Sequence, residues 1–323
     1  MIISQTPLRI SFLGGGTDFE DFYKEHGGAV LTTAIDKSVF VIAKERFDNS
    51  IYLNYSKKEI ISNIDDIQHE LMKYAMTITG TRDSIEITTL SDIPSEGSGL
   101  GSSSSITIAL LHALYAYQDV LLDAQRLADD ACYIEIDLCK EPIGKQDQYI
   151  AALGGLQYIT FSEKGVMSDR VSITEEATRE LNKDLMLLYT SYTRRSSSIL
   201  INLKKSITNK IPILKELTTL AQEGRTLLEN NDFEEFGLLL HESWQLKKEL
   251  ASNTSNSELD SLYDIARKAG AIGGKICGAG GGGFLLLYCP RESQPQVREK
   301  LGLKEMPVTI GAPGSRIIFD HRR

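Results

Sequence analysis

Cysteine is scarce in this chain of 323 residues, and its four copies, at positions 132, 139, 277 and 289, form no C-x-x-C pair. Three of the four lie among apolar residues, which favours reduced thiols in a cytoplasmic protein over a disulfide framework. The five histidines are scattered, and none of them pairs with an acid or a cysteine at metal-ligand spacing. The sequence therefore indicates neither a disulfide-stabilised scaffold nor a zinc site.

Long apolar runs and excess positive charge are also missing. No run approaches the roughly 18 apolar residues that cross a bilayer, and we expect neither a membrane span nor a signal peptide. Lysine and arginine number 35 against 44 aspartates and glutamates, which gives a formal net charge of −9. This balance argues against a nucleic-acid partner. An anionic substrate would need a local basic cluster to bind against the overall field.

Glycine and serine are abundant at one junction, where PSEGSGLGSSSS, residues 94–105, runs directly into the apolar segment ITIALLHALYAY. Glycines at 97, 99 and 101 let backbone N–H groups turn toward an anion, and a helix that starts near Ser103 adds its own amides. The alternative is a flexible linker, but linkers rarely abut a segment with helical periodicity. The junction predicts a phosphate cradle. It is not a Walker A loop, because no Gly-Lys-Ser/Thr closes it.

A second glycine cluster, residues 278–283, lies in KICGAGGGGFLLLYCP. It matches G-x-G-x-x-G formally, but the apolar run FLLLY that follows reads as a strand, whereas a dinucleotide-binding fold requires a helix there. Two interpretations stay open: a tight turn between strands, or bare backbone that packs against another loop or a ligand.

Two carboxylates stand out between these clusters. The segment 123–140 places Glu135 on one helical face with small or apolar residues, so we expect it to be partly buried and to bind Mg²⁺. The alternative is a helix-edge residue that reaches solvent. Asp147 follows a glycine-containing turn in EPIGKQDQ. It is either a helix N-cap or a carboxylate that takes a proton from a substrate hydroxyl.

The pattern of elements predicts an α+β protein of two domains, residues 1–183 and 184–323. Strands are expected over 1–13, 29–35, 37–47, 84–93, 156–161, 184–193 and 315–319, and the last of them is a candidate to return to the first domain. Helices are expected over 65–79, 103–118, 123–140, through much of 196–268, and near 292–301.

Together, PSEGSGLGSSSS, GKQDQ and KICGAGGGGF resemble, in this order, the three motifs of the superfamily of galactokinase, homoserine kinase, mevalonate kinase and phosphomevalonate kinase (GHMP kinases). The resemblance implies a ribosomal-protein-S5-like N-terminal domain and a ferredoxin-like C-terminal domain. Arg9, Asp18 and Gly27-Gly28 are similar to the sugar-recognition segment of the galactokinase-like branch. Galactokinases carry Glu-His where this chain has Gly15-Gly16, and this version is most similar to the heptose 7-phosphate kinase branch.

The resemblance implies ATP and Mg²⁺ as cofactors and a small sugar phosphate as substrate. Asp147 would be the base, Lys145 would offset charge on the transferring phosphoryl group, and Ser103, or else Ser104, would bind Mg²⁺ with Glu135. The residues that would hold the nucleotide are Gly97, Ser98, Gly99, Leu100, Gly101, Ser102, Ser103, Ser104, Gly278, Ala279, Gly280 and Gly281. The residues that would hold the sugar are Arg9, Gly15, Gly16, Thr17, Asp18, Arg194 and Arg195.

Arg194 and Arg195 stand at an expected strand-to-helix turn, where guanidinium groups and helix amides suit the phosphate of the substrate. The alternative is a solvated arginine pair at a surface helix start. The favoured activity is phosphorylation of the anomeric hydroxyl of D-glycero-D-manno-heptose 7-phosphate, for surface-polysaccharide precursors. Alternatives are a fucose-, galactose- or isoprenoid-type kinase of the same superfamily, or a ligand-sensing member without turnover.

Overall fold

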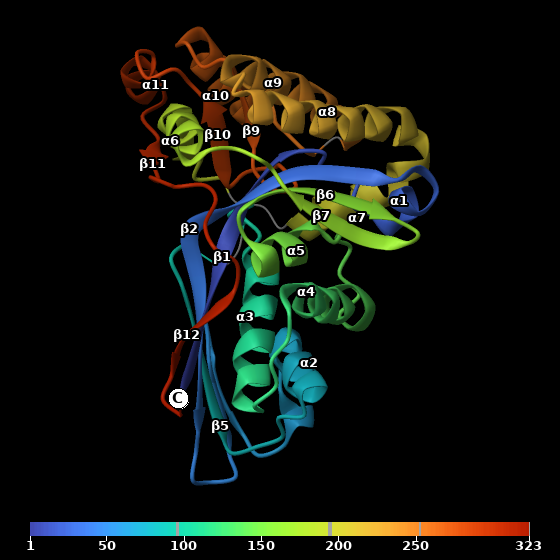
Figure 1. The fold of residues 1–323 in the computed structure, drawn as a ribbon, viewed down its shortest axis with the longest axis vertical. Coiled ribbons are helices and arrows are strands. Elements are labelled where there is room, and N and C mark those ends of the chain that lie inside the picture. Colours follow the sequence, from blue (N-terminus) through green and yellow to red (C-terminus); the bar gives the residue numbers. More distant parts are fainter. Residues whose placement is uncertain (95–96, 193–195, 252, 323) are drawn as a thin grey trace.

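Two β-sheets organise the chain (Figure 1). The computed structural model describes residues 1–94, 97–192, 196–251 and 253–322, and within these ranges the strands form one sheet of eight and one of four. Arg194 and Arg195 lie outside the described residues.

The larger sheet is built around β1 (Ile2–Leu13) and β2 (Gly28–Glu45), which pair antiparallel along most of their length. The C-terminal part of β2 pairs with β5 (Ile85–Ser91), and its N-terminal part pairs with β6 (Leu156–Ser162). β12 (Arg316–Asp320) pairs antiparallel with β1, so the last strand lies in the sheet formed by the N-terminal half of the chain. The other strands of this sheet are β3 (Ile51–Asn54), β4 (Lys58–Ile61) and β7 (Gly165–Arg170).

Helices cover one face of the larger sheet, and α3 (Ser102–Tyr117) lies directly against it (Figure 1). Its buried alanines and leucines allow a close approach, and two serine hydroxyls fix its position on β1. Ser105 donates to the backbone oxygen of Pro7 over 2.8 Å, and Ser4 donates to that of Ala109 over 2.7 Å. The other helices of this half are α1 (Glu20–His26), the 3-10 turn Ile64–Asp66, α2 (Glu70–Thr79), α4 (Ala124–Cys132), the π-helix Tyr133–Leu138 and α5 (Gln146–Leu153).

The smaller sheet has the order β11-β8-β10-β9, and side chains of its two central strands are buried on both faces. Alternate residues of β8 (Leu185–Tyr189) and β10 (Phe284–Tyr288) therefore serve two cores: Leu187 and Leu286 join the large core shared with the first sheet, whereas Leu188 and Leu285 join a smaller one. The remaining elements are β9 (Gly273–Ile276), β11 (Lys304–Glu305), α6 (Glu175–Asp184), α7 (Ser196–Ser206), the 3-10 turn Ile207–Lys210, α8 (Ile211–Asn230), α9 (Phe233–Leu250), α10 (Ser257–Lys268) and α11 (Gln294–Leu301).

Several expectations differ from the structure. The helix expected over 65–79 begins only at Glu70, and the strand expected over 184–193 ends at Tyr189. The strands expected over 29–35 and 37–47 are one strand, β2, because the polar pair Asp36-Lys37 forms a bulge opposite Pro7 and Leu8 instead of ending it. The helix expected over 123–140 changes to π-helical hydrogen bonding at Tyr133. The four cysteines are free, as expected. No helix in the described part of the chain combines the length and apolar character needed to cross a membrane.

Candidate active site

The loop before α3 turns its backbone inward at alternate residues. Gly97, Gly99 and Gly101 have φ angles of 73°, 75° and 74°, in the left-handed region that glycine adopts without strain. Gly101 caps α3 without a side-chain hydrogen bond, and the hydroxyl of Ser102 is buried with no partner among the described residues. Left-handed backbone, a helix N-terminus and an unpartnered hydroxyl are the features expected of the anion cradle that the sequence predicts.

The second glycine cluster packs against this cradle. A Cβ atom on Gly99 would lie 2.5 Å from the backbone oxygen of Cys277, and one on Gly283 would lie 2.4 Å from that of Ser98. Both distances are far shorter than any real contact, so side chains are excluded on either side. The cluster is therefore more than a tight turn: its bare backbone seats the hairpin of β9 and β10 on the cradle loop.

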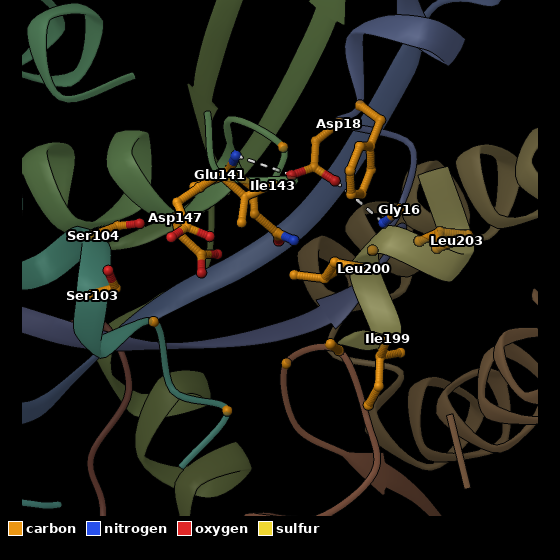
Figure 2. Close-up of a pocket in the computed structure, with 18 of the residues that line it drawn as sticks. Gly16, Asp18, Ser103, Ser104, Glu141, Ile143, Asp147, Ile199, Leu200 and Leu203 are labelled. Atoms are coloured by element: carbon orange, nitrogen blue, oxygen red, sulfur yellow. Dashed lines mark hydrogen bonds between the residues drawn. The ribbon is translucent and has the colours of Figure 1, made fainter. Parts of the chain in front are cut away.

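A cavity of about 560 Å³ opens beside the two loops, a size typical of small-molecule sites. Figure 2 shows Ser103, Ser104 and Asp147 toward one side of it, and Asp18, Gly16 and Leu203 toward the other. Several predicted site residues line the cavity. They are Arg9, Gly15, Gly16, Asp18, residues 97–99 and 101–104 of the cradle, Asp147, Gly278 and Ala279.

Asp147 lies in the first turn of α5 and is held by Arg9 of β1. Nε and Nη2 of Arg9 donate to the two carboxylate oxygens over 2.7 and 2.6 Å, and Nη1 donates to the backbone oxygen of Gly99 over 2.6 Å. This bidentate pair fixes the plane of the carboxylate. The Asp147 side chain keeps 23% of its surface exposed, whereas that of Arg9 keeps 5%. Arg9 thus ties the carboxylate to the cradle and leaves it accessible from the cavity.

Asp18 is the second carboxylate of the cavity and comes from the loop between β1 and α1. Its oxygens accept from the backbone N–H groups of Gly16 and Gln146, each over 3.2 Å (Figure 2). Burial raises the pKa of Asp18, and the neighbouring Asp147 raises it further, whereas these hydrogen bonds lower it. A fixed acceptor this close to Asp147 suits the hydroxyl groups of a polyol.

Glu135 is buried, with 1% of its surface exposed, so the alternative of a solvent-reaching helix edge does not hold. Its Oε1 accepts from Ser103 over 3.2 Å and from Thr107 over 2.9 Å. Its Oε2 accepts from Ser104 over 2.7 Å and from Gln148. Burial raises the pKa of Glu135 to about 7, although the hydrogen bonds from Ser104, Thr107 and Gln148 lower it. The carboxylate and the hydroxyls of Ser103 and Ser104 form a set of hard oxygen donors behind the cradle.

Some predicted residues lie elsewhere. Lys145 is not among the lining residues, and its ammonium nitrogen lies 5.6 Å from the centre of the Tyr23 ring. Thr17 is fully buried, and its hydroxyl holds the turn, with its single proton between the backbone oxygens of Gly14 and Ala29, each 2.9 Å away, so it is not exposed to a sugar.

The side chain of Leu100 is buried in the core and anchors the cradle loop. Gly280 and Gly281 are not among the lining residues and lie against Thr254, which is one of them. The N–H of Gly281 donates to the Thr254 backbone oxygen over 2.7 Å, and a Cβ on Gly280 would lie 2.4 Å from the same atom.

Several lining residues carry no recognisable signal in the sequence. Lys247 of α9 is a buried cation, Gln146 and Glu141 flank the Asp147 turn, and Ile199, Leu200 and Leu203 of α7 form an apolar wall. A lysine in the helical run 233–250 looks like an ordinary surface residue, because the contact that buries it comes from the glycine hairpin some 30 residues later. The helical periodicity of α7 predicted a helix but not the surface that it covers.

Comparisons with known proteins bear on this site. The model described as "GHMP kinases N terminal domain" matches residues 54–155, and "GHMP kinases C terminal" matches residues 225–307. The D-glycero-alpha-D-manno-heptose 7-phosphate kinase of Campylobacter jejuni is 30% identical over 303 residues, which cover 89% of each chain. The L-fucokinase/L-fucose-1-P guanylyltransferase of Bacteroides fragilis is 27% identical over 99% of this chain, which spans only 37% of that longer protein.

Among solved structures, a D-glycero-D-manno-heptose 1-phosphate kinase from Bacteriodes thetaiotaomicron superposes with a TM-score of 0.83 over 99% of this chain and 100% of that one. At 23% identity this likeness shows the shared fold. The two domain matches and the 30% identical relative show more. With the cradle, the glycine hairpin and the Asp147 turn meeting at one cavity, the chain belongs to the GHMP kinase family and is an ATP-dependent phosphotransferase.

Proposed function

We propose that this chain transfers the γ-phosphoryl group of ATP to the anomeric hydroxyl of D-glycero-D-manno-heptose 7-phosphate. The observation that carries the proposal is the placement of Asp147, held by Arg9 between the anion cradle and the polyol-binding Asp18. The heptose 7-phosphate kinase relative, similar over 89% of this chain, supports this choice of sugar. Kinases of fucose type remain the second candidate, supported by the 27% identical fucokinase.

In this mechanism the chain positions two substrates and moves one proton. The cradle amides and the hydroxyl of Ser102 bind the nucleotide phosphates, and Asp18 accepts hydrogen bonds from sugar hydroxyls. Asp147 orients the attacking hydroxyl and accepts its proton, while Arg9 keeps the carboxylate in plane. The transition state is loose, so positioning and charge stabilisation contribute more than the strength of the base.

The oxygen donors behind the cradle fit a magnesium ion. Glu135 is a buried carboxylate whose pKa is raised by burial, and Ser103 and Ser104 offer hydroxyls beside it. We assign Glu135 and Ser103 as the residues that hold Mg²⁺, which when bound neutralises charge on the nucleotide phosphates. Arg194 and Arg195 remain the sequence-based assignment for the phosphate already on the sugar.

An ADP-release assay over a panel of sugars tests the function. We expect turnover with D-glycero-D-manno-heptose 7-phosphate, and much lower kcat/KM with the unphosphorylated heptose, fucose, galactose and mevalonate. Asp147→Asn should lower kcat by a few hundred-fold or more, the loss typical of a positioned base, while ATP affinity stays within about twofold. Higher kcat/KM with fucose would assign the second candidate, and unchanged turnover in Asp147→Asn would remove Asp147 from the mechanism.

A further inference from the structure

Lys247 is a buried cation at the cavity to which the mechanism above gives no role. It lies on α9 with 8% of its surface exposed, and its ammonium donates a hydrogen bond to the backbone oxygen of Gly278. None of the ion pairs in the described part of the chain involves it. An ammonium group has three N–H donors, so two remain for a ligand.

Burying the unpaired ammonium group of Lys247 lowers the stability of the folded state. A buried charge without a carboxylate partner is unfavourable, and an apolar side chain of similar length would fit the same path at lower cost. Burial, together with the nearby positive charge of Arg9, lowers the pKa of Lys247 to about 8. A residue that is unfavourable for folding and faces a cavity points to a role in binding or chemistry.

The position of Lys247 lies between the two substrate regions. On one side is Gly278 of the glycine hairpin, which is seated on the cradle. On the other side Nζ lies 3.7 Å from the point where a Cβ atom on Gly15 would stand, in the sugar segment. Arg9, the other cation among the described lining residues, is already paired with Asp147. Among the described lining residues, Lys247 is therefore the cation that forms no ion pair, and it lies between the glycine hairpin and the sugar segment.

We propose that Lys247 is a catalytic residue that contacts the phosphoryl group during its transfer, the part that the sequence assigned to Lys145. This inference rests on the phosphoryl transfer proposed above but not on which sugar is the acceptor. The acceptor oxygen forms a bond to the γ-phosphorus, the bond from that phosphorus to the bridging oxygen breaks, and its electron pair leaves with ADP. The hydroxyl proton goes to Asp147. Lys247 forms no covalent bond, and its N–H groups donate to the phosphoryl oxygens, where charge accumulates.

Three variants test the proposal. Lys247→Met keeps the length and removes the charge, and Lys247→Arg restores a charge. Lys248→Met is the matched control, because Lys248 is the next residue of α9, pairs with Asp260 of α10 and is not among the residues that line the cavity. With any sugar that the parent accepts, Lys247→Met should lower kcat by about 100-fold or more, the loss typical of one lost electrostatic donor, with both KM values within a few-fold. Lys247→Arg should recover part of kcat, and Lys248→Met should match the parent.

Two further measurements separate catalysis from folding and from the choice of sugar. The melting temperature of Lys247→Met should not fall below that of the parent, since an unpaired buried charge has been removed. With Mg²⁺ present, the parent should bind ADP with tetrafluoroaluminate, a mimic of the phosphoryl group in transit, more tightly than ADP alone. Lys247→Met should lose that preference by about tenfold or more.

The outcomes that overturn the proposal differ from those that overturn the function. If no sugar is turned over by the parent, the proposed function fails, and the fluoroaluminate measurement still decides the role of Lys247. Unchanged kcat, or a lower melting temperature with an intact fluoroaluminate preference, makes Lys247 structural. A raised sugar KM with kcat intact instead makes it a hydroxyl-binding residue beside Gln146 and Gly15.

Discussion

At the scale of single residues, the cavity works through unequal compensation of charge. The guanidinium of Arg9 is matched by the Asp147 carboxylate in a bidentate pair, so neither charge is left for the ligand in full. Glu135 and Lys247 are each buried with only neutral partners in the described residues. Their pKa values shift toward the neutral forms, to about 7 and about 8, because burial disfavours charge. Both are sites where a ligand charge can be bound.

The pKa of Lys247 predicts a pH dependence. The charged and titratable groups that influence it are Arg9, Asp18, Asp147, Cys277 and Lys275. The lysine carries its charge below about pH 8 and loses it above. Because kcat/KM reports groups of the free enzyme, kcat/KM of the parent should decline as pH rises through about 8. In Lys247→Met this decline should be absent, and in Lys247→Arg it should shift to higher pH.

The same pKa shift affects the free energy of unfolding in the opposite direction from kcat/KM. The folded pKa lies below the ordinary value of 10.5, so between about pH 8 and 10.5 the unfolded chain binds more protons. The free energy of unfolding of the parent, relative to Lys247→Met, should therefore rise with pH in that window. Denaturant titrations at several pH values measure it, and a relative stability that falls with pH would contradict the shifted pKa.

At the scale of elements, the π-helix Tyr133–Leu138 sets the position of Glu135. One turn of i→i+5 bonding offsets the side chains that follow it, and such turns are frequent at functional sites. Helical periodicity predicted the buried stripe that contains Glu135, because the stripe depends only on local spacing. It did not predict the π turn, because that change depends on how the segment packs against α2 and α3.

Glu135→Gln tests the assignment of this element. The amide can place its NH₂ on the Oε1 side, where the partners Ser103 and Thr107 are hydroxyls that can accept as well as donate. We therefore expect a folded variant whose activity needs a Mg²⁺ concentration higher by roughly tenfold or more, since an amide oxygen is a poorer ligand for a hard cation. Mg²⁺ should also raise the melting temperature of the parent more than that of the variant. If the Mg²⁺ titrations of the parent and of Glu135→Gln coincide, Glu135 does not bind Mg²⁺ and its role is structural.

For the loops, too, the sequence predicts local backbone structure but not the contacts between distant segments. The cradle and the glycine hairpin were predictable, since alternate glycines and the apolar runs beside them constrain the backbone locally. That the two loops touch through Gly99 and Gly283 depends on segments about 180 residues apart. The two lysines illustrate the same limit: Lys247 lines the cavity and Lys145 does not, and this depends on tertiary packing that local sequence patterns do not report.

At the scale of the whole molecule, two halves share one hydrophobic core: the part built on the larger sheet, and the part that contains α8, α9 and the smaller sheet. Leu13 and Leu31 of the larger sheet and Leu217 and Leu220 of α8 belong to the same buried cluster. Lys275 of β9 also reaches across, donating to the backbone oxygens of Ser11 and Phe12 on β1 over 2.7 and 2.8 Å. Because β1 carries Arg9 and the hairpin after β9 carries Gly278, this junction fixes the distance between the two parts of the active site. The halves are thus expected to unfold together.

Gly224 of α8 provides the test of that coupling. A Cβ atom there would lie 2.3 Å from Cδ1 of Leu13 and 3.2 Å from Cδ2 of Leu31, so the helix rests on the larger sheet with no room for a side chain. Gly224→Leu should force the halves apart and lower the free energy of unfolding by about 1–3 kcal/mol, the usual cost of overpacking. Activity should fall as well, since α8 leads into α9 and Lys247. Glu223→Leu adds the same side chain one residue earlier on the exposed face and should change neither quantity. Calorimetry of the parent should show one transition, lowered as a whole in Gly224→Leu. Two separate transitions, with the upper one unmoved by the substitution, would mean that the sheets fold independently and that the active site is assembled only by docking.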